Sequence, residues 1–312
     1  MNRFCTLGFA LNLPPCSGKK KRRDLSSNHG NLRVAMKTGR IFSIKRGGKM
    51  ENKKISEKLS KYLKLSTPPV AAKMCTSKSQ LPPGTKIPSK QWGVDFRACQ
   101  AVHVARRYET TVAVPAEEMP CPSGGVALGF YKANKVYYSG IYLSPKEMSQ
   151  KAKKVWARNV SKLPGGKYKY FLAAPLDQAS FQPDVILVYG IPGQVSKLIQ
   201  AAALKTGECL EGRTIVGTAC SEWMSAAMKT QKCQYVFPCD GERRYSALDD
   251  SEMVFAIPYK KIGEILQGLE VAYYSKDRRR YPTQRFMIHE APMPERYAKL
   301  LASLKKDAGM AP

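Results

Sequence analysis

Four of the nine cysteines in this 312-residue chain occupy positions where a thiol could do chemistry. Cys99 and Cys220 each open a run of helix-compatible residues, "CQAVHVARRYETTVAV" and "CSEWMSAAMKTQKCQYVFP". Cys121 and Cys239 each follow a proline and precede a glycine, in "PCPSGG" and "VFPCDG". Four thiolates suit a tetrahedral zinc ion or an iron–sulfur cluster. We therefore predict a metal site at these four cysteines, the alternative being that they are small buried hydrophobes.

Local sequence predicts how each cysteine is presented. Cys99 and Cys220 fall at expected helix N-termini, where backbone N–H groups and the helix dipole lower a thiol pKa. In "GTACSEW" the glycine, threonine and serine predict a tight, capped strand-to-helix turn. Cys121 and Cys239 are expected at strand ends, each exposed by a turn. The remaining cysteines are predicted to be structural (Cys75, Cys209 and Cys233) or to belong to an N-terminal extension (Cys5 and Cys16).

Two further side chains are candidate ligand-binding residues. His103 lies four residues after Cys99, on the same helical face, which is ligand or acid–base geometry. Gln194, in "YGIPGQ", lies where a buried strand runs into a helix, the usual ligand edge of an α/β sheet. A half-exposed histidine without a role and a helix-capping glutamine are the alternatives.

Arg244 is the third candidate. It follows Cys239 by five residues and could hold a carboxylate or phosphate in a fork. The alternative is a surface salt bridge to Asp249 or Asp250.

A repeated order of features indicates how the chain positions these residues. "PPVAAKMC" (68–75) and "PDVILVYG" (183–190) are both typical of buried strands, and each is followed by a cysteine-led helix, a β-rich run and a "PC" pair. A strand, a proline and an amphipathic helix then follow, with Pro145 and Pro258 as the prolines. We predict an α/β (or α+β) fold of two similar half-units, 60–165 and 175–270, related by a pseudo-twofold axis with a ligand crevice between them. Chance similarity is the alternative.

Both ends of the chain differ from this central part. Residues 1–49 carry twelve Lys and Arg against one acid, which predicts a basic extension. The "RGGK" before Met50 can be encoded by codons that contain AGGAGGU, a bacterial ribosome-binding sequence, so we expect translation to begin at Met50. A helix is predicted from there, with apolar residues at 55, 59, 62, 63 and 65. Residues 271–312 are predicted to be a basic tail with a helix over 294–307, whose apolar face holds Tyr297, Leu300, Leu301 and Leu304.

The net charge of +28 raises the question of nucleic-acid binding. The one dense basic cluster outside the extension is "SKDRRRYPTQR", and no helix-turn-helix, zinc-finger or aromatic RNA-binding pattern accompanies it. We expect a solvated basic surface instead. No apolar run is long enough to span a bilayer. The chain also lacks a catalytic carboxylate pair, a Ser-His-Asp set, a phosphate loop and a dinucleotide fingerprint.

Several of these stretches together resemble domain-of-unknown-function family 169, the uncharacterised ArCR family of archaea and anaerobic bacteria. They are "KLSKYLKLSTPPVAAKM", "RACQAVHVAR", "PCPSGGVALGF", "PDVILVYGIPGQ" and "PCDGERRYSALDDSEMVFAIP", and the resemblance covers residues 55–270. It implies a prokaryotic, cytoplasmic protein of no settled activity. The family pattern points to Cys99, Cys121, Gly129, Gln194, Cys239, Gly241 and Arg244.

Three functions stay open on the sequence. The first is a cytoplasmic, cysteine-centred metal or iron–sulfur protein of anaerobic metabolism, working with a small molecule or a redox partner. The second is a metal-free enzyme that uses paired cysteine thiolates as acid and base. The third is a small-molecule binding or regulatory module with structural cysteines. A homo-oligomer is compatible with each of them.

Overall fold

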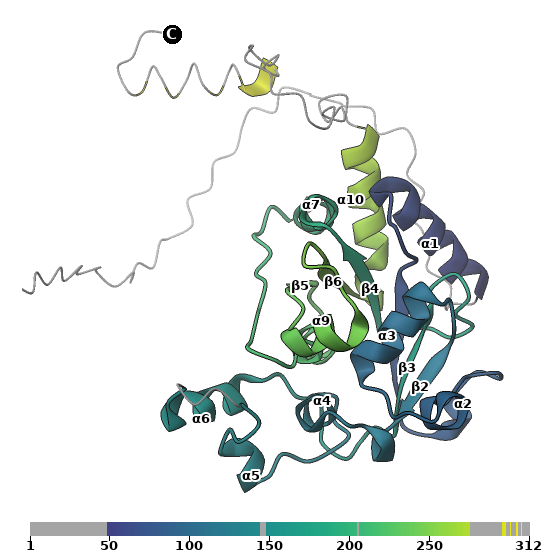
Figure 1. Ribbon diagram of the computed structural model, residues 1–312. Coiled ribbons are helices and arrows are strands. Elements are labelled where there is room, and N and C mark those ends of the chain that lie inside the picture. The colour runs from purple at the N-terminus through teal and green to yellow at the C-terminus, as the bar shows by residue number, and fades with distance from the viewer. Residues whose placement is uncertain are drawn as a thin grey trace, which may run out of the picture. The chain divides into compact units, whose positions relative to one another are not determined.

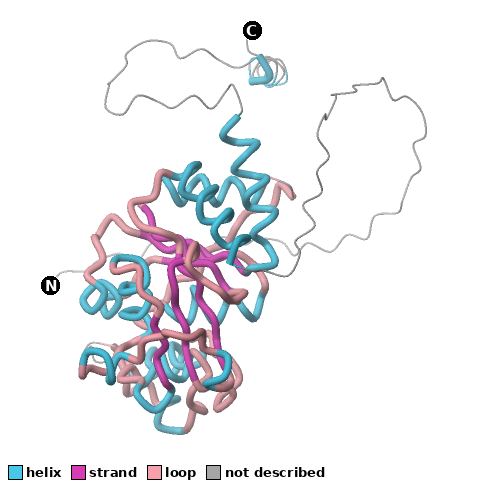
Figure 2. The backbone as a smooth tube through the Cα atoms, turned by 90° about the vertical axis from the view of Figure 1, so that its right-hand side faces the viewer, coloured by secondary structure: helices cyan, strands magenta, loops and turns pink. Residues whose placement is uncertain are grey.

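A six-stranded antiparallel sheet forms the centre of the computed structural model (Figures 1 and 2). The structure describes residues 49–143, 148–204 and 206–274, and residues 295–297, 300, 304 and 307. The strand order is β2-β3-β1-β4-β6-β5. The strands are β1 (Val70–Cys75), β2 (Val112–Pro115), β3 (Tyr170–Pro175), β4 (Val185–Gly190), β5 (Gln234–Val236) and β6 (Met253–Pro258).

The strands are apolar on both sides, so both faces of the sheet must be covered. Every residue of β2, β4 and β6 is buried. Such continuous apolar runs form strands that lie between two layers of helices. The mixed α/β class that the sequence predicts is therefore confirmed, although the sheet is antiparallel throughout its named strands.

Helices from different parts of the chain cover the two faces. One face carries α3 (Ala98–Arg107), the π-helix η3 (Ser221–Ala226), α8 (Ala227–Thr230) and α9 (Asp240–Ser246). Next to η3 lies α4 (Pro122–Ala127), whose buried Val126 and Ala127 belong to a separate small core. The other face carries α1 (Lys49–Leu63), α7 (Pro192–Ala203) and α10 (Ile262–Tyr274). The remaining helices are short or peripheral: α2 (Pro88–Trp92), α5 (Lys135–Tyr138), α6 (Gln150–Asn159) and the 3-10 turns Lys78–Gln80, Ala116–Glu118 and Tyr259–Lys261.

The opening helix forms where the apolar spacing predicts it. Four residues of α1 are buried in the core between the sheet and the helices α1, α7 and α10: Ile55, Leu59, Tyr62 and Leu63. Their spacing of three and four residues places them on one face of the helix. This prediction is confirmed.

The strand pairing is symmetric about the centre of the sheet. Exchanging β1, β2 and β3 with β4, β5 and β6 gives the same strand order, read from the other edge. Ala71 pairs with Ile186 at the centre. Val70 pairs with Pro175 as Val185 pairs with Pro258. This is the pairing that a duplicated unit would produce, while the duplication itself stays a prediction.

One landmark of the proposed repeat was wrong. Residues 139–143 form turns and loop, so the strand expected before Pro145 is absent there. In the pairing pattern β3 is the counterpart of β6, and it begins at Tyr170, beyond the expected end of the first half-unit at 165. Within this stretch Leu143 is buried in a separate small core with Trp156 of α6, whereas Ile141 is exposed.

The predicted C-terminal helix is described at six positions, all helical: residues 295–297, 300, 304 and 307. Tyr297, Leu300 and Leu304 are each more than half exposed. Leu301, residues 1–48 and the basic cluster at 275–285 lie outside the described residues, so the expectations for them stay predictions.

Candidate functional site

All four candidate cysteines lie at the starts of helices on the same face of the sheet. Cys99 is the second residue of α3. The other three stand directly before α4, η3 and α9 and are Cys121, Cys220 and Cys239. All four thiols are free and half-buried. The Asp-Gly after Cys239 is helical, so the turn expected there is instead the first turn of α9, because β5 ends three residues earlier.

The sulfurs of Cys121 and Cys220 lie next to the same point. A Cβ added at Gly124 would lie 3.1 Å from Cys121 Sγ and 3.5 Å from Cys220 Sγ. Cys121 Sγ also accepts a hydrogen bond from the Gly124 backbone N–H at 3.3 Å, and Tyr142 Oη lies 3.8 Å from it. A glycine here therefore keeps the space beside both sulfurs open.

The turn that presents Cys220 is strained. Gly217 and Thr218 both have positive φ, at 67° and 57°. A β-branched residue rarely adopts this conformation, and such strain is often found at functional sites. The hydroxyls of Thr218 and Ser123 lie 2.6 Å apart and hold the turn against α4. A π-helix, itself rare and often functional, follows directly.

The thiols interact electrostatically with one another. Burial raises the pKa of Cys99, and the neighbouring Glu242 raises it further. Burial also raises the pKa of Cys220, with contributions from Cys121, Cys239 and Cys99 in that order. The pKa of Cys239 is raised by burial and then by Glu242. Each of these thiols is thus within range of another's charge, and the sulfurs of Cys121 and Cys220 lie beside a common point.

The expectation that helix N-termini lower the thiol pKa values was wrong for Cys99 and Cys220. Both side chains lose most of their water, and the groups nearest to them are other thiols and a carboxyl. Loss of water disfavours the charged form, and negative neighbours disfavour it further.

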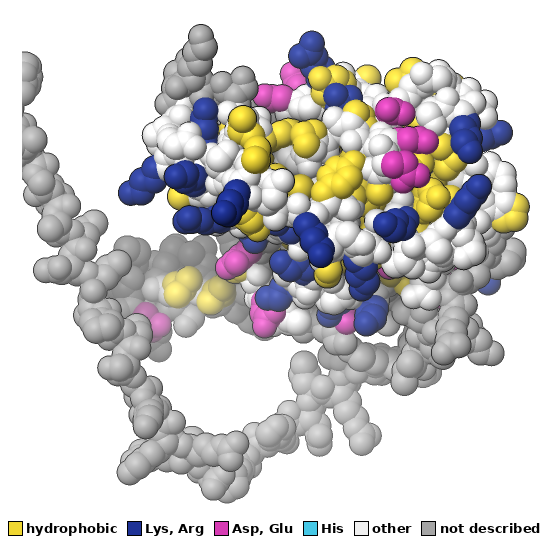
Figure 3. Space-filling model, turned by 90° about the horizontal axis from the view of Figure 1, so that it is seen from below, with side chains coloured by type: hydrophobic (Ala, Val, Ile, Leu, Met, Phe, Trp, Pro, Cys, Tyr) yellow, Lys and Arg dark blue, Asp and Glu magenta, His cyan; other side chains and the backbone are white. Residues whose placement is uncertain are grey.

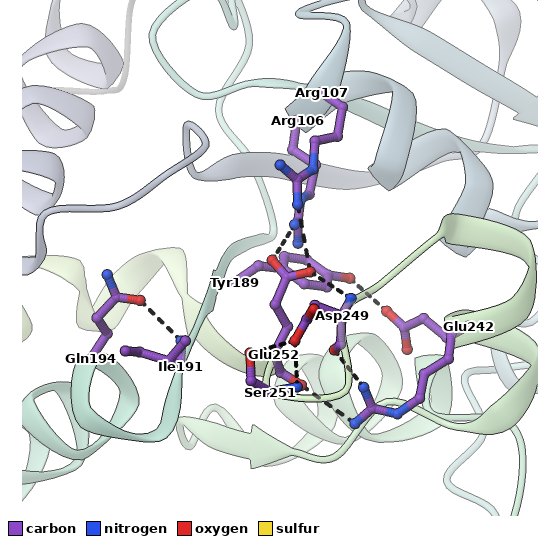
Figure 4. A network of polar contacts seen from close by, with 10 residues as sticks. Arg106, Arg107, Tyr189, Ile191, Gln194, Glu242, Asp249, Ser251 and Glu252 are labelled. Atoms are coloured by element: carbon purple, nitrogen blue, oxygen red, sulfur yellow. Dashed lines mark hydrogen bonds and ion pairs between the residues drawn. The ribbon is translucent and has the colours of Figure 1, made fainter.

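Glu242 is a site residue that the sequence reasoning missed. Its side chain is 2 % exposed, and burial raises its pKa. Tyr189 Oη donates to its Oε1 at 2.7 Å (Figure 4). Trp223 Nε1 donates to its Oε2 at 3.3 Å. Nothing in "CDGERR" distinguishes this glutamate from a solvated one, since only the packing of α9 turns it inward.

A buried ion pair is linked to Glu242 through Tyr189. Arg106, 2 % exposed, contacts Glu252 through Nη2, and its guanidinium carbon lies 4.3 Å from the centre of the Tyr189 ring (Figure 4). Arg107, the next residue, makes only a longer contact with Glu252, at 3.7 Å. Glu252, Arg106, Tyr189 and Glu242 thus form a continuous polar row beneath the cysteines.

His103 lies in this polar row and not among the thiols. Burial lowers its pKa, and Arg106 and Arg107 lower it further. Its Nδ1 is buried and makes no hydrogen bond to the residues that the structure describes. The ring packs edge-on against Tyr108, at 5.9 Å between centroids.

The structure places Gln194 on the opposite face of the sheet. Its Oε1 accepts from the Ile191 N–H at 2.9 Å (Figure 4). Its Nε2 donates to the carbonyls of Leu63 and Lys64 at 3.1 and 2.9 Å. These bonds fasten the start of α7 to the end of α1. The geometry is that of the capping alternative.

Arg244 is exposed at the thiol side of α9. The salt bridge expected as its alternative is made by its neighbour, because Arg243 reaches Asp250 at 3.7 Å and the Asp249 carbonyl at 2.7 Å. Arg244 instead has its guanidinium carbon 5.8 Å from the centre of the Tyr245 ring.

The cysteines as they stand do not form a closed zinc site. Across the described ranges, no three His, Cys, Asp or Glu side chains are placed to hold one metal ion. A zinc ion would need four ligands within roughly 2.3 Å of its centre.

A groove adjoins the thiol region. It has a volume of about 570 Å³ between α6 and residues 213–216, with the buried Glu222 at its floor. Trp156 forms part of its wall and stacks on Tyr142 at 5.4 Å. Seen from this side, hydrophobic side chains gather between lysines and arginines (Figure 3). This groove lies beside α6, and the crevice expected between the half-units stays a prediction.

The two buried thiols on the other face of the sheet, Cys75 and Cys233, should make the folded protein less stable at high pH. Burial raises the pKa of Cys75 to about 11 and that of Cys233 to about 12. The folded protein therefore keeps protons that the unfolded chain releases above about pH 9. The free energy of unfolding should fall from there towards pH 11, by at most about 1.4 kcal/mol per pH unit for each thiol. Urea unfolding across this range checks it. Cys75→Ala should flatten the slope, whereas replacing the exposed Cys209 should leave it unchanged.

Fold and site together define an α/β protein with one antiparallel sheet and four free cysteines at helix starts on one face. Residues 58–268 match the profile of domain-of-unknown-function family 169, described as uncharacterised ArCR, and the chain belongs to this family. It is 24% identical over 218 residues to an uncharacterised protein of Methanocaldococcus jannaschii, covering 69% of this chain and 92% of that protein. No solved structure matches the chain. Among the described helices, none is long and apolar enough to cross a membrane.

Proposed function

We propose that this protein binds an iron–sulfur cluster through Cys99, Cys121, Cys220 and Cys239. The observation that carries the proposal is that four half-buried thiols lie at four helix starts on one face of the sheet, with the sulfurs of Cys121 and Cys220 beside the same point. A cluster accepts wider spacing than one ion because each thiolate binds a different iron.

Electrostatics support a positively charged occupant. Cys99, Cys220 and Cys239 all have raised pKa values, and a buried carboxyl lies beside them. Thiols in this setting stay protonated unless a cation compensates the thiolate charge. Coordinated metal supplies that charge and deprotonates the thiols directly.

The local backbone also suits a sulfur-rich group. The space beside Gly124 is open towards two of the sulfurs, and Cys121 Sγ already accepts a backbone N–H. Hydrogen bonds to cluster sulfurs and the fields of helix starts stabilise the negative charge of a thiolate-bound cluster. The four helix starts would act together in this way.

The acid–base alternative has weaker support. A catalytic thiolate needs a lowered pKa, which positive neighbours provide. Here the direction is the reverse at three of the four thiols. Small-molecule binding has one observation in its favour, the groove beside Trp156, and that groove could serve a cluster protein as a substrate site.

The setting we infer is the cytoplasm of an anaerobic prokaryote. The free thiols of the described chain suit a reducing compartment. A redox partner or a small-molecule substrate would complete the function, and assembly into a homo-oligomer is compatible with it.

Anaerobic purification of the chain, followed by iron and acid-labile sulfide analysis, tests the proposal. We expect iron and sulfide in matching amounts together with a brown colour. Chain that is well folded but free of iron and sulfide, after purification and anaerobic reconstitution, would refute it. Stoichiometric zinc in place of iron would also refute it.

A further inference from the structure

Two arginines share one tyrosine ring at the edge of the thiol region. The guanidinium carbon of Arg97 lies 3.6 Å from the centre of the Tyr245 ring, and that of Arg244 lies 5.8 Å from it. Arg97 stands directly before α3, which carries Cys99, and the other two residues belong to α9, which follows Cys239. Residues from two helices therefore place two positive charges around a single ring.

No acidic side chain of the described residues neutralises these charges. Neither Arg97 nor Arg244 makes an ion pair there, since Asp250 is engaged by Arg243. Arg97 is held by an uncharged residue instead, because its Nη1 and its backbone N–H both point to Gln100 Oε1, at 3.4 and 2.9 Å. Gln100 thus holds Arg97 in place, while no carboxylate of the described residues neutralises its charge.

The tyrosine ring lies beside a thiol, with room between them. A Cβ added at Gly241 would lie 3.8 Å from Cys239 Sγ and 3.9 Å from Tyr245 Cδ2. Gly241 has no such atom, so the sulfur and the ring border one small open space. A small group held by the arginines would therefore lie next to Cys239.

We propose that Arg97, Arg244 and Tyr245 bind the carboxylate or phosphate group of a small organic ligand beside Cys239. Guanidinium groups recognise planar or tetrahedral oxyanions through paired N–H donors, and they stack on aromatic faces while doing so. The tyrosine face serves as a platform that fixes the donors. The site stands on these contacts whether or not the cysteines hold iron, so it goes beyond the cluster proposal.

The size of the site favours a small ligand over an acidic protein surface. Two guanidinium carbons 3.6 and 5.8 Å from one ring centre suit a single small oxyanion, whereas docking of an acidic protein spreads over a wide charged patch. An atom at the Cβ position of Gly241 would contact both Cys239 Sγ and Tyr245 Cδ2. The ligand class is therefore a small organic acid or phosphate ester.

Calorimetric titration of the full chain with malonate and with inorganic phosphate, at low ionic strength, tests the site. We expect saturable one-to-one binding of at least one of these anions. Arg97→Gln and Arg244→Gln should each weaken it by roughly tenfold, as expected for the loss of a charge-assisted hydrogen-bond pair. Lys260→Gln, an equal charge change at an exposed residue of the opposite face, should leave the affinity unchanged.

Arg97→Lys and Arg244→Lys keep the positive charge and serve as controls in case the glutamine variants do not fold. We expect them to bind more weakly than the native chain and more tightly than the glutamine variants, because lysine lacks the fork. The proposal is overturned if neither anion saturates, or if the double glutamine variant binds as tightly as the native chain. Arginine-dependent binding of polyglutamate without malonate or phosphate binding would overturn it in favour of an acidic protein partner. Iron content, measured on the same samples, reports separately on the cluster.

Discussion

Cys239→Ser should lose the bound iron, while Cys209→Ser keeps it. Cys239 is one of four converging thiols, whereas Cys209 is exposed and lies outside that group. A cluster with one thiolate ligand removed has an open iron and is lost or degraded during purification. We expect the iron and sulfide contents to fall to near zero, with the same result for Cys99, Cys121 and Cys220. Metal analysis of anaerobically purified variants measures this.

Cys75→Ser is the control that distinguishes the loss of a metal ligand from a loss of stability. This thiol is buried on the opposite face, so its replacement should lower the free energy of unfolding and leave iron bound. Iron retained in full by Cys239→Ser would contradict the assignment of the ligands. Iron lost equally from all variants, including Cys75→Ser, would show that folding and not ligation controls metal content.

Arg106→Met should destabilise the protein by about 3–5 kcal/mol, the usual cost of leaving one member of a buried ion pair without its partner. The Arg106 side chain is 1% exposed and that of Glu252 is 8% exposed, so water cannot replace the lost contact. The Tyr189 ring would also lose the guanidinium that packs on it. Urea unfolding at neutral pH measures the change.

Arg107→Met is the matched control for this prediction. The same substitution on the same helix removes a charge that is 39% exposed and 3.7 Å from Glu252. Exposed pairs contribute about 0–1 kcal/mol, so the loss should be small. Adding Glu252→Gln to Arg106→Met should restore part of the stability, because the uncompensated buried charge is removed. Equal losses for the two arginine variants would contradict the assignment of the buried pair.

Local patterns in the sequence were enough to place several elements. The spacing of Ile55, Leu59 and Leu63 marks α1, and the apolar run from Val185 to Gly190 marks a buried strand. Both follow from interactions within a few residues, since a helix or strand must turn its apolar side chains towards a core. The helix starts at Cys99 and Cys220 were found for the same reason.

The repeated order of features also predicted which strands, far apart in the sequence, occupy equivalent positions in the sheet. It related the strands that pair symmetrically in the sheet, with Ala71 opposite Ile186 at the centre. It failed at residues 139–143 because a short apolar stretch followed by proline fits a strand or a loop equally well. The choice depends on whether another strand is available as a partner, which spacing along the chain cannot show.

Residues close together in the chain were sufficient to predict α1, several buried strands, the family and the helix starts at Cys99 and Cys220. The helix starts at Cys121 and Cys239, expected as strand ends, and the surroundings of all four cysteines became known only from the packed structure. Burial and the approach of Glu242 reversed the expected direction of the thiol pKa values, and Arg97 met Tyr245 across two helices. Gln194 was assigned to the opposite face by its bonds to Leu63 and Lys64. Desolvation and charge depend on distances between residues remote in sequence, and these distances exist only once the chain has packed.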